Sequence, residues 1–96
     1  MADLEKVTGR VIAHRRRRAG LTQETLAEAA EVDVSYISQL ERGVKSPTLR
    51  TLFRIAAGLG LAPSALLKGI ERELAKPPTP SASAKKARVP RRGGTR

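Results

Sequence analysis

Four side chains between residues 33 and 42 could recognise nucleic-acid bases. They share one face of a predicted short helix, and they are Val34, Ser35, Ser38 and Gln39. Hydroxyl, amide and small apolar groups can contact base edges in the major groove of B-DNA, where the donor and acceptor patterns distinguish all four base pairs. Long Lys and Glu side chains, the usual residues of a solvated helix face, are missing from this face. The pattern therefore indicates either a DNA-reading helix or an ordinary helical hairpin.

Groups that could carry out catalysis or hold a metal are scarce. The chain has no Cys and one histidine, His14, so a thiol nucleophile, a disulfide and a Cys- or His-based zinc site are excluded. We expect no enzyme activity, no cofactor, no metal and no small-molecule ligand. No apolar run approaches the roughly 18 residues of a membrane span, and no signal peptide is evident. We therefore expect a cytoplasmic protein without a membrane partner.

The chain is strongly basic, and its charge is unevenly distributed. Nineteen Lys and Arg residues stand against nine Asp and Glu residues, for a formal net charge of +10. Residues 1–75 hold all nine acids, whereas residues 76–96 hold seven cations, no acid and four of the six prolines. We therefore predict a folded domain over 1–75 and a disordered, basic, Pro-rich tail over 76–96, because the tail lacks apolar side chains to offset the entropy of ordering. The tail is either a non-specific polyanion-binding arm or a solubilising segment.

Five short helices are predicted to position these residues. Apolar residues recur at helical spacing and no segment alternates with a period of two, so the predicted class is all-α. The helices are expected at about 3–19, 22–30, 33–42, 48–59 and 63–75, with N-caps at Asp3, Thr22, Asp33 and Thr48. The apolar face of the first helix is expected to hold Leu4, Val7, Val11 and Ile12. The core face of the fourth is expected to hold Leu49, Leu52, Phe53, Ala56 and Leu59.

Several stretches together carry a family resemblance. They are Gly20-Leu21-Thr22-Gln23, Leu26-Ala27, Tyr36-Ile37-Ser38-Gln39-Leu40-Glu41-Arg42-Gly43 and Ser46-Pro47-Thr48-Leu49. Over about residues 7–67 the chain resembles the Xre family of helix-turn-helix regulators, typified by phage repressor and Cro proteins. The resemblance implies a five-helix, repressor-like domain that binds double-stranded DNA as a homodimer on a palindromic operator.

The resemblance also implies roles for individual residues. The base-reading positions correspond to Val34, Ser35, Ser38 and Gln39. Positions that meet the sugar-phosphate backbone correspond to Gln23, Tyr36, Lys45, Ser46 and Thr48. Gln23 is further expected to brace the recognition helix. Arg16 and Glu41 correspond to an internal ion pair that ties the first helix to the third.

Two residues depart from the family pattern. Glu31 stands where the family commonly has a glycine in the left-handed conformation, so we expect a cost of about 1 kcal/mol or a differently bent turn. Ala62 replaces the usual Ser or Thr cap before Pro63. This replacement is expected to weaken the start of the last helix by about 1 kcal/mol.

Apolar residues gather on the last helix and the adjoining end of the fourth, and we expect the homodimer to form there. The predicted interface consists of Leu61, Leu66, Ile70 and Leu74. The alternative is that these residues close the core of one chain. The predicted function is sequence-specific transcriptional regulation by a repressor or autoregulator. A protein-interaction module or antitoxin-type partner on the same scaffold, and a non-specific nucleoid-type binder, are the alternatives.

Overall fold

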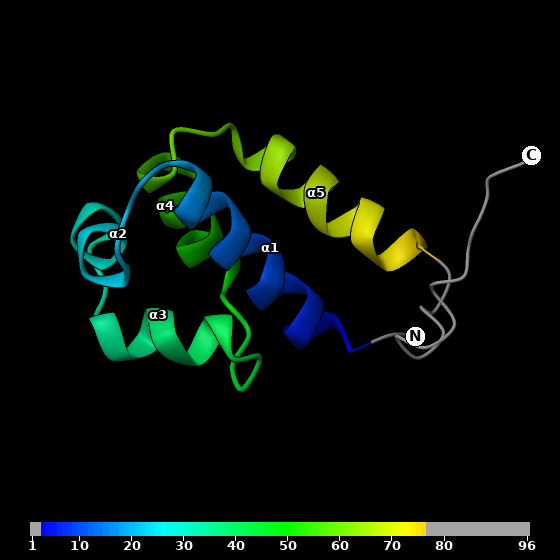
Figure 1. The fold of residues 1–96 in the computed structure, drawn as a ribbon, viewed down its shortest axis with the longest axis horizontal. Coiled ribbons are helices and arrows are strands. Elements are labelled where there is room, and N and C mark those ends of the chain that lie inside the picture. Colours follow the sequence, from blue (N-terminus) through cyan, green and yellow to red (C-terminus); the bar gives the residue numbers. More distant parts are fainter. Residues whose placement is uncertain (1–2, 77–96) are drawn as a thin grey trace, which may run out of the picture.

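The described part of the chain contains five α-helices (Figure 1). The computed structural model describes residues 3–76, in which no strand occurs, and residues 1–2 and 77–96 lie outside the described part. The helices are α1 Leu4–Arg18, α2 Gln23–Ala30, α3 Val34–Glu41, α4 Leu49–Gly58 and α5 Pro63–Ala75. The predicted all-α class and the five predicted helices are confirmed. The predicted tail over 76–96 lies outside the described residues apart from Lys76, and it stays a prediction.

Side-chain caps account for three of the helix starts. Asp3 accepts a hydrogen bond from the backbone three residues on at 3.2 Å, and Thr48 does the same for Thr51 at 3.1 Å. Thr22 and Thr25 form a reciprocal capping box, in which each hydroxyl accepts from the other residue's backbone N–H. These bonds satisfy amide groups that the first turn of a helix leaves unpaired.

The other two helices begin without such a bond. Asp33 occupies the N-cap position of α3, but its side chain accepts no cap hydrogen bond, which corrects the capping role predicted for it. Ala62 likewise provides no side-chain cap for α5. Pro63 partly compensates at the start of α5, because its ring fixes a helical φ and it has no N–H to satisfy.

The core lies among all five helices, with α1 at the centre. α3 and α5 pack on opposite sides of α1, and α2 packs against α3 and α4 (Figure 1). Side chains from every helix meet in the core, and the largest completely buried ones are Ile12, Leu26, Ile37, Leu40, Ile55 and Leu66. Burial of each such side chain contributes about 1.5–3 kcal/mol. The core therefore holds α3 in place from beneath.

Three apolar side chains predicted for the core lie at the surface instead. Leu4, Leu49 and Phe53 are 39%, 68% and 51% exposed. The core-facing stripe of α4 consists of Leu52, Ile55 and Ala56, followed by Leu59 just after the helix. Leu49 and Phe53 are four residues apart and share another face with the exposed Ala57. We call these three residues the α4 apolar strip.

The predicted dimer interface is corrected at two of its four residues. Leu66 is fully buried and Ile70 is 6% exposed within a single chain, because α5 packs against both α1 and α4. Neither side chain is available to a second copy. Leu61 and Leu74 are half-buried at the edge of the core.

Gly9 permits the close crossing of α1 and α3. A Cβ at this position would clash with the carbonyl oxygen of Leu40 and lie 2.7 Å from that of Glu41. Since both atoms belong to the backbone, they could not move aside cheaply. Gly9 thereby fixes the end of α3 against α1.

The helices are short relative to a bilayer. Within the described part of the chain, no single helix is long and apolar enough to cross a membrane. α4 and α5 reach that length and composition only together, and the chain bends by 104° between them.

Candidate nucleic-acid interface

A tight turn over residues 31–33 joins α2 to α3. Glu31 is left-handed, with φ 62° and ψ 44°, and among the described residues it is the only non-glycine residue with a positive φ. Of the two outcomes expected for this position, the structure therefore contains the left-handed turn. The backbone N–H of Val32 donates to the carbonyl of Ala27 at 3.0 Å, and the Val32 side chain packs against the core. These contacts offset a conformational cost of roughly 1–2 kcal/mol.

α3 directs a polar face away from the core. Ile37 and Leu40 are buried beneath the helix. The predicted base-reading residues are Val34 and Ser35, which are exposed, and Ser38 and Gln39, which are half-buried. Ser35 and Ser38 are three residues apart, and the pairs 34/38 and 35/39 are four apart, so the four side chains lie on one side of the helix. The structure thus brings all four together on a surface whose backbone is held from below.

A part-buried polar cluster of Arg16, Gln23 and Glu41, here called the bracing cluster, joins three helices. Arg16 Nε donates to Glu41 Oε2 at 2.7 Å, and Arg16 Nη2 donates to Oε1 at 3.1 Å. Gln23 Nε2 donates to the same Oε1 at 2.9 Å, and Arg16 Nη1 donates to the carbonyl of Leu21 at 2.9 Å. The ion pair expected between α1 and α3 is therefore present, and α2 joins it through Gln23.

The bracing cluster favours one arrangement of its helices. The Arg16 and Glu41 side chains are only 13% and 7% exposed. The hydrogen bond to Glu41 raises the pKa of Arg16 above its usual range, although burial opposes that shift. Arg16 therefore stays charged, and a charge largely removed from water is stable only while its partner remains in place.

The residues predicted to meet the DNA backbone lie around α3. Lys45, Ser46 and Thr48 are exposed in the turn that leads to α4. Tyr36 is half-buried and packs against the core. Gln23 donates its amide to Glu41, so the structure contains the bracing contact expected of Gln23.

Glu5 and Arg42 lie near this turn but were not predicted from the sequence to belong to the site. Ser46 Oγ donates to Glu5 Oε2 at 3.1 Å, which links the start of α1 to the turn and places an acid among the predicted phosphate contacts. Arg42, exposed at the C-cap of α3, donates through Nε to the carbonyl of Ser38 at 3.4 Å. Glu5 and Ser46 are 41 residues apart, and no local sequence pattern connects them.

Comparison with known proteins matches the stretch that forms this surface. The chain fits the Helix-turn-helix family over residues 12–66, which includes all of α2, α3 and α4. It is 40% identical over 60 residues to the uncharacterized HTH-type transcriptional regulator y4dJ of Sinorhizobium fredii, covering 62% of this chain and 78% of that protein. It is 37% identical over 59 residues to the control protein C.MunI of Mycoplasma sp, covering 62% and 80%. The solved wild-type restriction-modification controller protein C.Esp1396I aligns with a TM-score of 0.70 and 33% identity, covering 79% of this chain and 99% of that one.

Proposed function

This chain belongs to the helix-turn-helix family and is a DNA-binding transcriptional regulator, and from that premise we propose that α3 reads an operator sequence in the major groove. The observation that carries the proposal is the outward face of α3, where short and amide side chains sit on a helix held by the bracing cluster. In such a complex, phosphate contacts supply affinity and register, and base contacts supply sequence choice.

The proposed contacts divide into those two classes. Base reading is assigned to Val34, Ser35, Ser38 and Gln39. The Gln39 amide can form a bidentate pair with adenine, which is worth about 1–3 kcal/mol of discrimination. Backbone contacts are assigned to Gln23, Tyr36, Lys45, Ser46 and Thr48. Lys45 contributes the charge, and the N–H groups of Leu49 and Arg50, which the Thr48 cap does not engage, suit a phosphate at the start of α4.

The regulator acts, in this proposal, as a homodimer on an operator with two-fold symmetry. One domain of this size contacts too few base pairs for high affinity or for a unique genomic site. The α4 apolar strip replaces the buried Leu66 and Ile70 as the proposed contact surface, because Leu49 and Phe53 are the large exposed apolar residues of α4. Two-fold pairing would place the two α3 helices about 34 Å apart, one turn of DNA.

The proposed mode of action is repression or autoregulation in the cytoplasm. C.Esp1396I is a restriction-modification controller, and control of a gene close to its own is a corresponding role for this chain. Its relatives are regulators rather than enzymes, and the proposal requires no cofactor.

Selection of bound duplexes from a random pool tests the base-reading assignment. We predict that the full-length chain enriches a palindromic sequence and that Gln39→Ala loses preference at one base position of each half-site. Lys45→Ala should weaken operator and random duplexes equally and lower the slope of log affinity against log salt by about one. Electrophoretic mobility shifts at several salt concentrations measure both effects.

Lys45→Ala is the matched control for Gln39→Ala, because both residues are proposed contacts but only one reads bases. Equal loss on all sequences after Gln39→Ala would refute base reading by Gln39. Enrichment of no sequence despite tight, salt-dependent binding would indicate a non-specific DNA binder. Absence of DNA binding would favour the protein-interaction or antitoxin-type alternative.

A further inference from the structure

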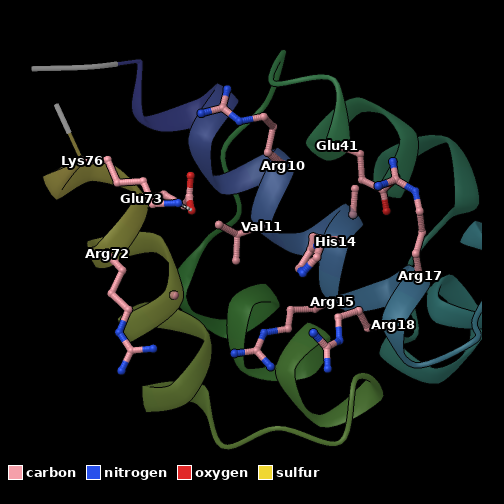
Figure 2. Close-up of a pocket in the computed structure, with 12 residues that line it drawn as sticks. Arg10, Val11, His14, Arg15, Arg17, Arg18, Glu41, Arg72, Glu73 and Lys76 are labelled. Carbon is pink, nitrogen blue, oxygen red and sulfur yellow. Dashed lines mark hydrogen bonds and ion pairs between the residues drawn. The ribbon is translucent and has the colours of Figure 1, made fainter. Parts of the chain in front are cut away.

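A cationic groove lies between α1 and α5 (Figure 2). Its volume is about 820 Å³. The cations that line it are Arg10, Arg15, Arg17, Arg18, Arg72 and Lys76. Figure 2 shows the labelled arginines arranged around Val11 and His14. Glu41 at the end of α3 also lines the groove, but none of the four proposed base-reading residues does. The groove is therefore separate from the surface proposed to read DNA.

Positive charge in the groove exceeds the negative charge beside it. Two acids line the groove, and both are already engaged. Glu41 accepts from Arg16 and Gln23, and Glu73 pairs with Lys76 at 2.8 Å. Five guanidinium groups that line the groove form no ion pair within residues 3–76, and they belong to Arg10, Arg15, Arg17, Arg18 and Arg72.

Gly69 lines the groove on the α5 side. It lies inside α5, where glycine costs about 0.5–1 kcal/mol relative to alanine. A Cβ on Gly69 would meet only Val11 Cγ1, at an ordinary contact distance of 3.4 Å. Packing therefore does not require glycine here, in contrast to Gly9. Its effect is to keep the α5 wall of the groove free of a side chain at this position.

We propose that this groove binds a small polyphosphorylated anion of the nucleoside triphosphate class. Guanidinium groups donate paired hydrogen bonds that match phosphate oxygens, and several of them suit a ligand with several phosphates. Val11 and Ala13 also line the groove, but they are only 7% and 6% exposed, so the arginines are expected to supply most of the affinity. The volume falls within the roughly 300–1,000 Å³ of small-molecule sites.

The shape and composition of the groove favour a compact ligand over a nucleic-acid strand. Neither Tyr36 nor Phe53 lines the groove, so it has no aromatic ring on which successive bases of a single strand could stack. A duplex is broad and convex. Its phosphates would contact the exposed arginines without entering the groove.

Titration of the full-length chain with two probes, ATP and inorganic tripolyphosphate, tests the proposal. At about 0.15 M salt, both should produce saturable amide shifts in nuclear magnetic resonance spectra, centred on Arg10, Gly69 and Arg72. The shifts should be absent from the four proposed base-reading residues of α3. Tighter binding of ATP would assign part of the affinity to the nucleoside. Equal binding would assign all of it to the phosphate chain.

Two variants separate binding in the groove from general attraction to a basic protein. Arg10→Ala/Arg72→Ala should weaken both probes by about tenfold or more, a change of about 1.4 kcal/mol. Gly69→Leu adds a side chain to the groove without changing its charge, and it should lower the affinity for both probes by a similar factor. The matched control, Arg54→Ala/Lys68→Ala, removes two exposed cations outside the groove and should change binding less than about twofold. Thermal unfolding checks that each variant is folded. If Gly69→Leu is not folded, the comparison of Arg10→Ala/Arg72→Ala with its control provides the test.

Several results would overturn the proposal. One is an equal loss of affinity for the probes in the control and groove variants. Another is wild-type affinity for the probes in a folded Gly69→Leu chain. A third is a response of the same amides to oligoglutamate or to a DNA duplex but to neither phosphate probe. That last result would identify the groove as a surface for an acidic protein segment or for DNA.

Discussion

The carboxylate of Glu41 accepts hydrogen bonds from both Arg16 and Gln23, so this one residue links α3 to α1 and α2. Truncation would leave the Arg16 guanidinium, whose side chain is 13% exposed, without its counter-charge. We predict that Glu41→Ala lowers the free energy of unfolding by about 3–5 kcal/mol. Urea denaturation measures this change.

Glu28→Ala is the control for this prediction, because Glu28 is an exposed acid on α2. It should alter the free energy of unfolding by no more than about 0.5 kcal/mol. Similar denaturation midpoints for the two variants would contradict a structural role for the bracing cluster.

At the scale of helices, two glycines provide a matched pair of tests. Gly9→Ala places a methyl group against the backbone carbonyls of α3, and we predict a destabilisation of about 1–3 kcal/mol from overpacking. Gly69→Ala meets only one side-chain atom at 3.4 Å, so its helix propensity should stabilise the chain by up to about 1 kcal/mol. Thermal unfolding of the two variants in parallel measures the difference. An unchanged or higher stability of Gly9→Ala would show that the α1–α3 crossing does not depend on Gly9.

The helices could be predicted from local sequence because their ends carry local signals. Thr22 and Thr48 are caps, and Gly20 and Gly60 adopt positive φ where the preceding helices stop. The inward face of α4 could not be predicted in the same way. Its apolar residues fit two helical stripes, and packing against α2 and α5 selects the one through Ile55 while leaving Phe53 at the surface.

The features of the candidate site likewise fall into those that could be predicted from the sequence and those that only the fold determines. The outward face of α3 and the Arg16–Glu41 pair were predictable, the first from helical spacing and the second through the family resemblance. The hydrogen bond between Glu5 and Ser46 was not, because it depends on how the start of α1 meets a distant turn. The groove beside Gly69 was not predictable either, since its cations come from two helices whose relative placement only the fold determines.

At the scale of the whole molecule, the α4 apolar strip predicts self-association. Phe53 is 51% exposed in one chain, so its replacement removes little from the core of that chain. We predict that Phe53→Gln weakens dimerisation by about tenfold or more, with little change in thermal stability. Analytical ultracentrifugation measures the dissociation constant.

Leu67→Gln is the control for that experiment. Leu67 is a comparably exposed apolar residue, at 46%, but it lies on α5 outside the strip. It should leave dimerisation unchanged. A monomeric wild-type chain at tens of micromolar, with and without a palindromic duplex, would refute the dimer.

The charge distribution of the whole chain leads to a prediction for the segment 77–96, which contains six cations and no acid. Deletion of residues 77–96 should weaken binding to operator and random DNA together and flatten the salt dependence, because phosphate neutralisation is independent of sequence. Fluorescence anisotropy with both duplexes, over a range of salt concentrations, measures the two affinities. Loss of operator preference, rather than of overall affinity, would show that the segment reads sequence.

The position of Tyr36 on α3 makes the intrinsic fluorescence of the protein a probe of that helix. The chain has one tyrosine and no tryptophan, so its intrinsic fluorescence arises at a single site, halfway into the core beneath α3. Emission therefore reports the packing of α3 itself, whereas in most proteins it averages over several chromophores. Detachment of α3 from the core becomes visible without a label, and its kinetics can be compared directly with the loss of helical circular dichroism, which sums over all the helices.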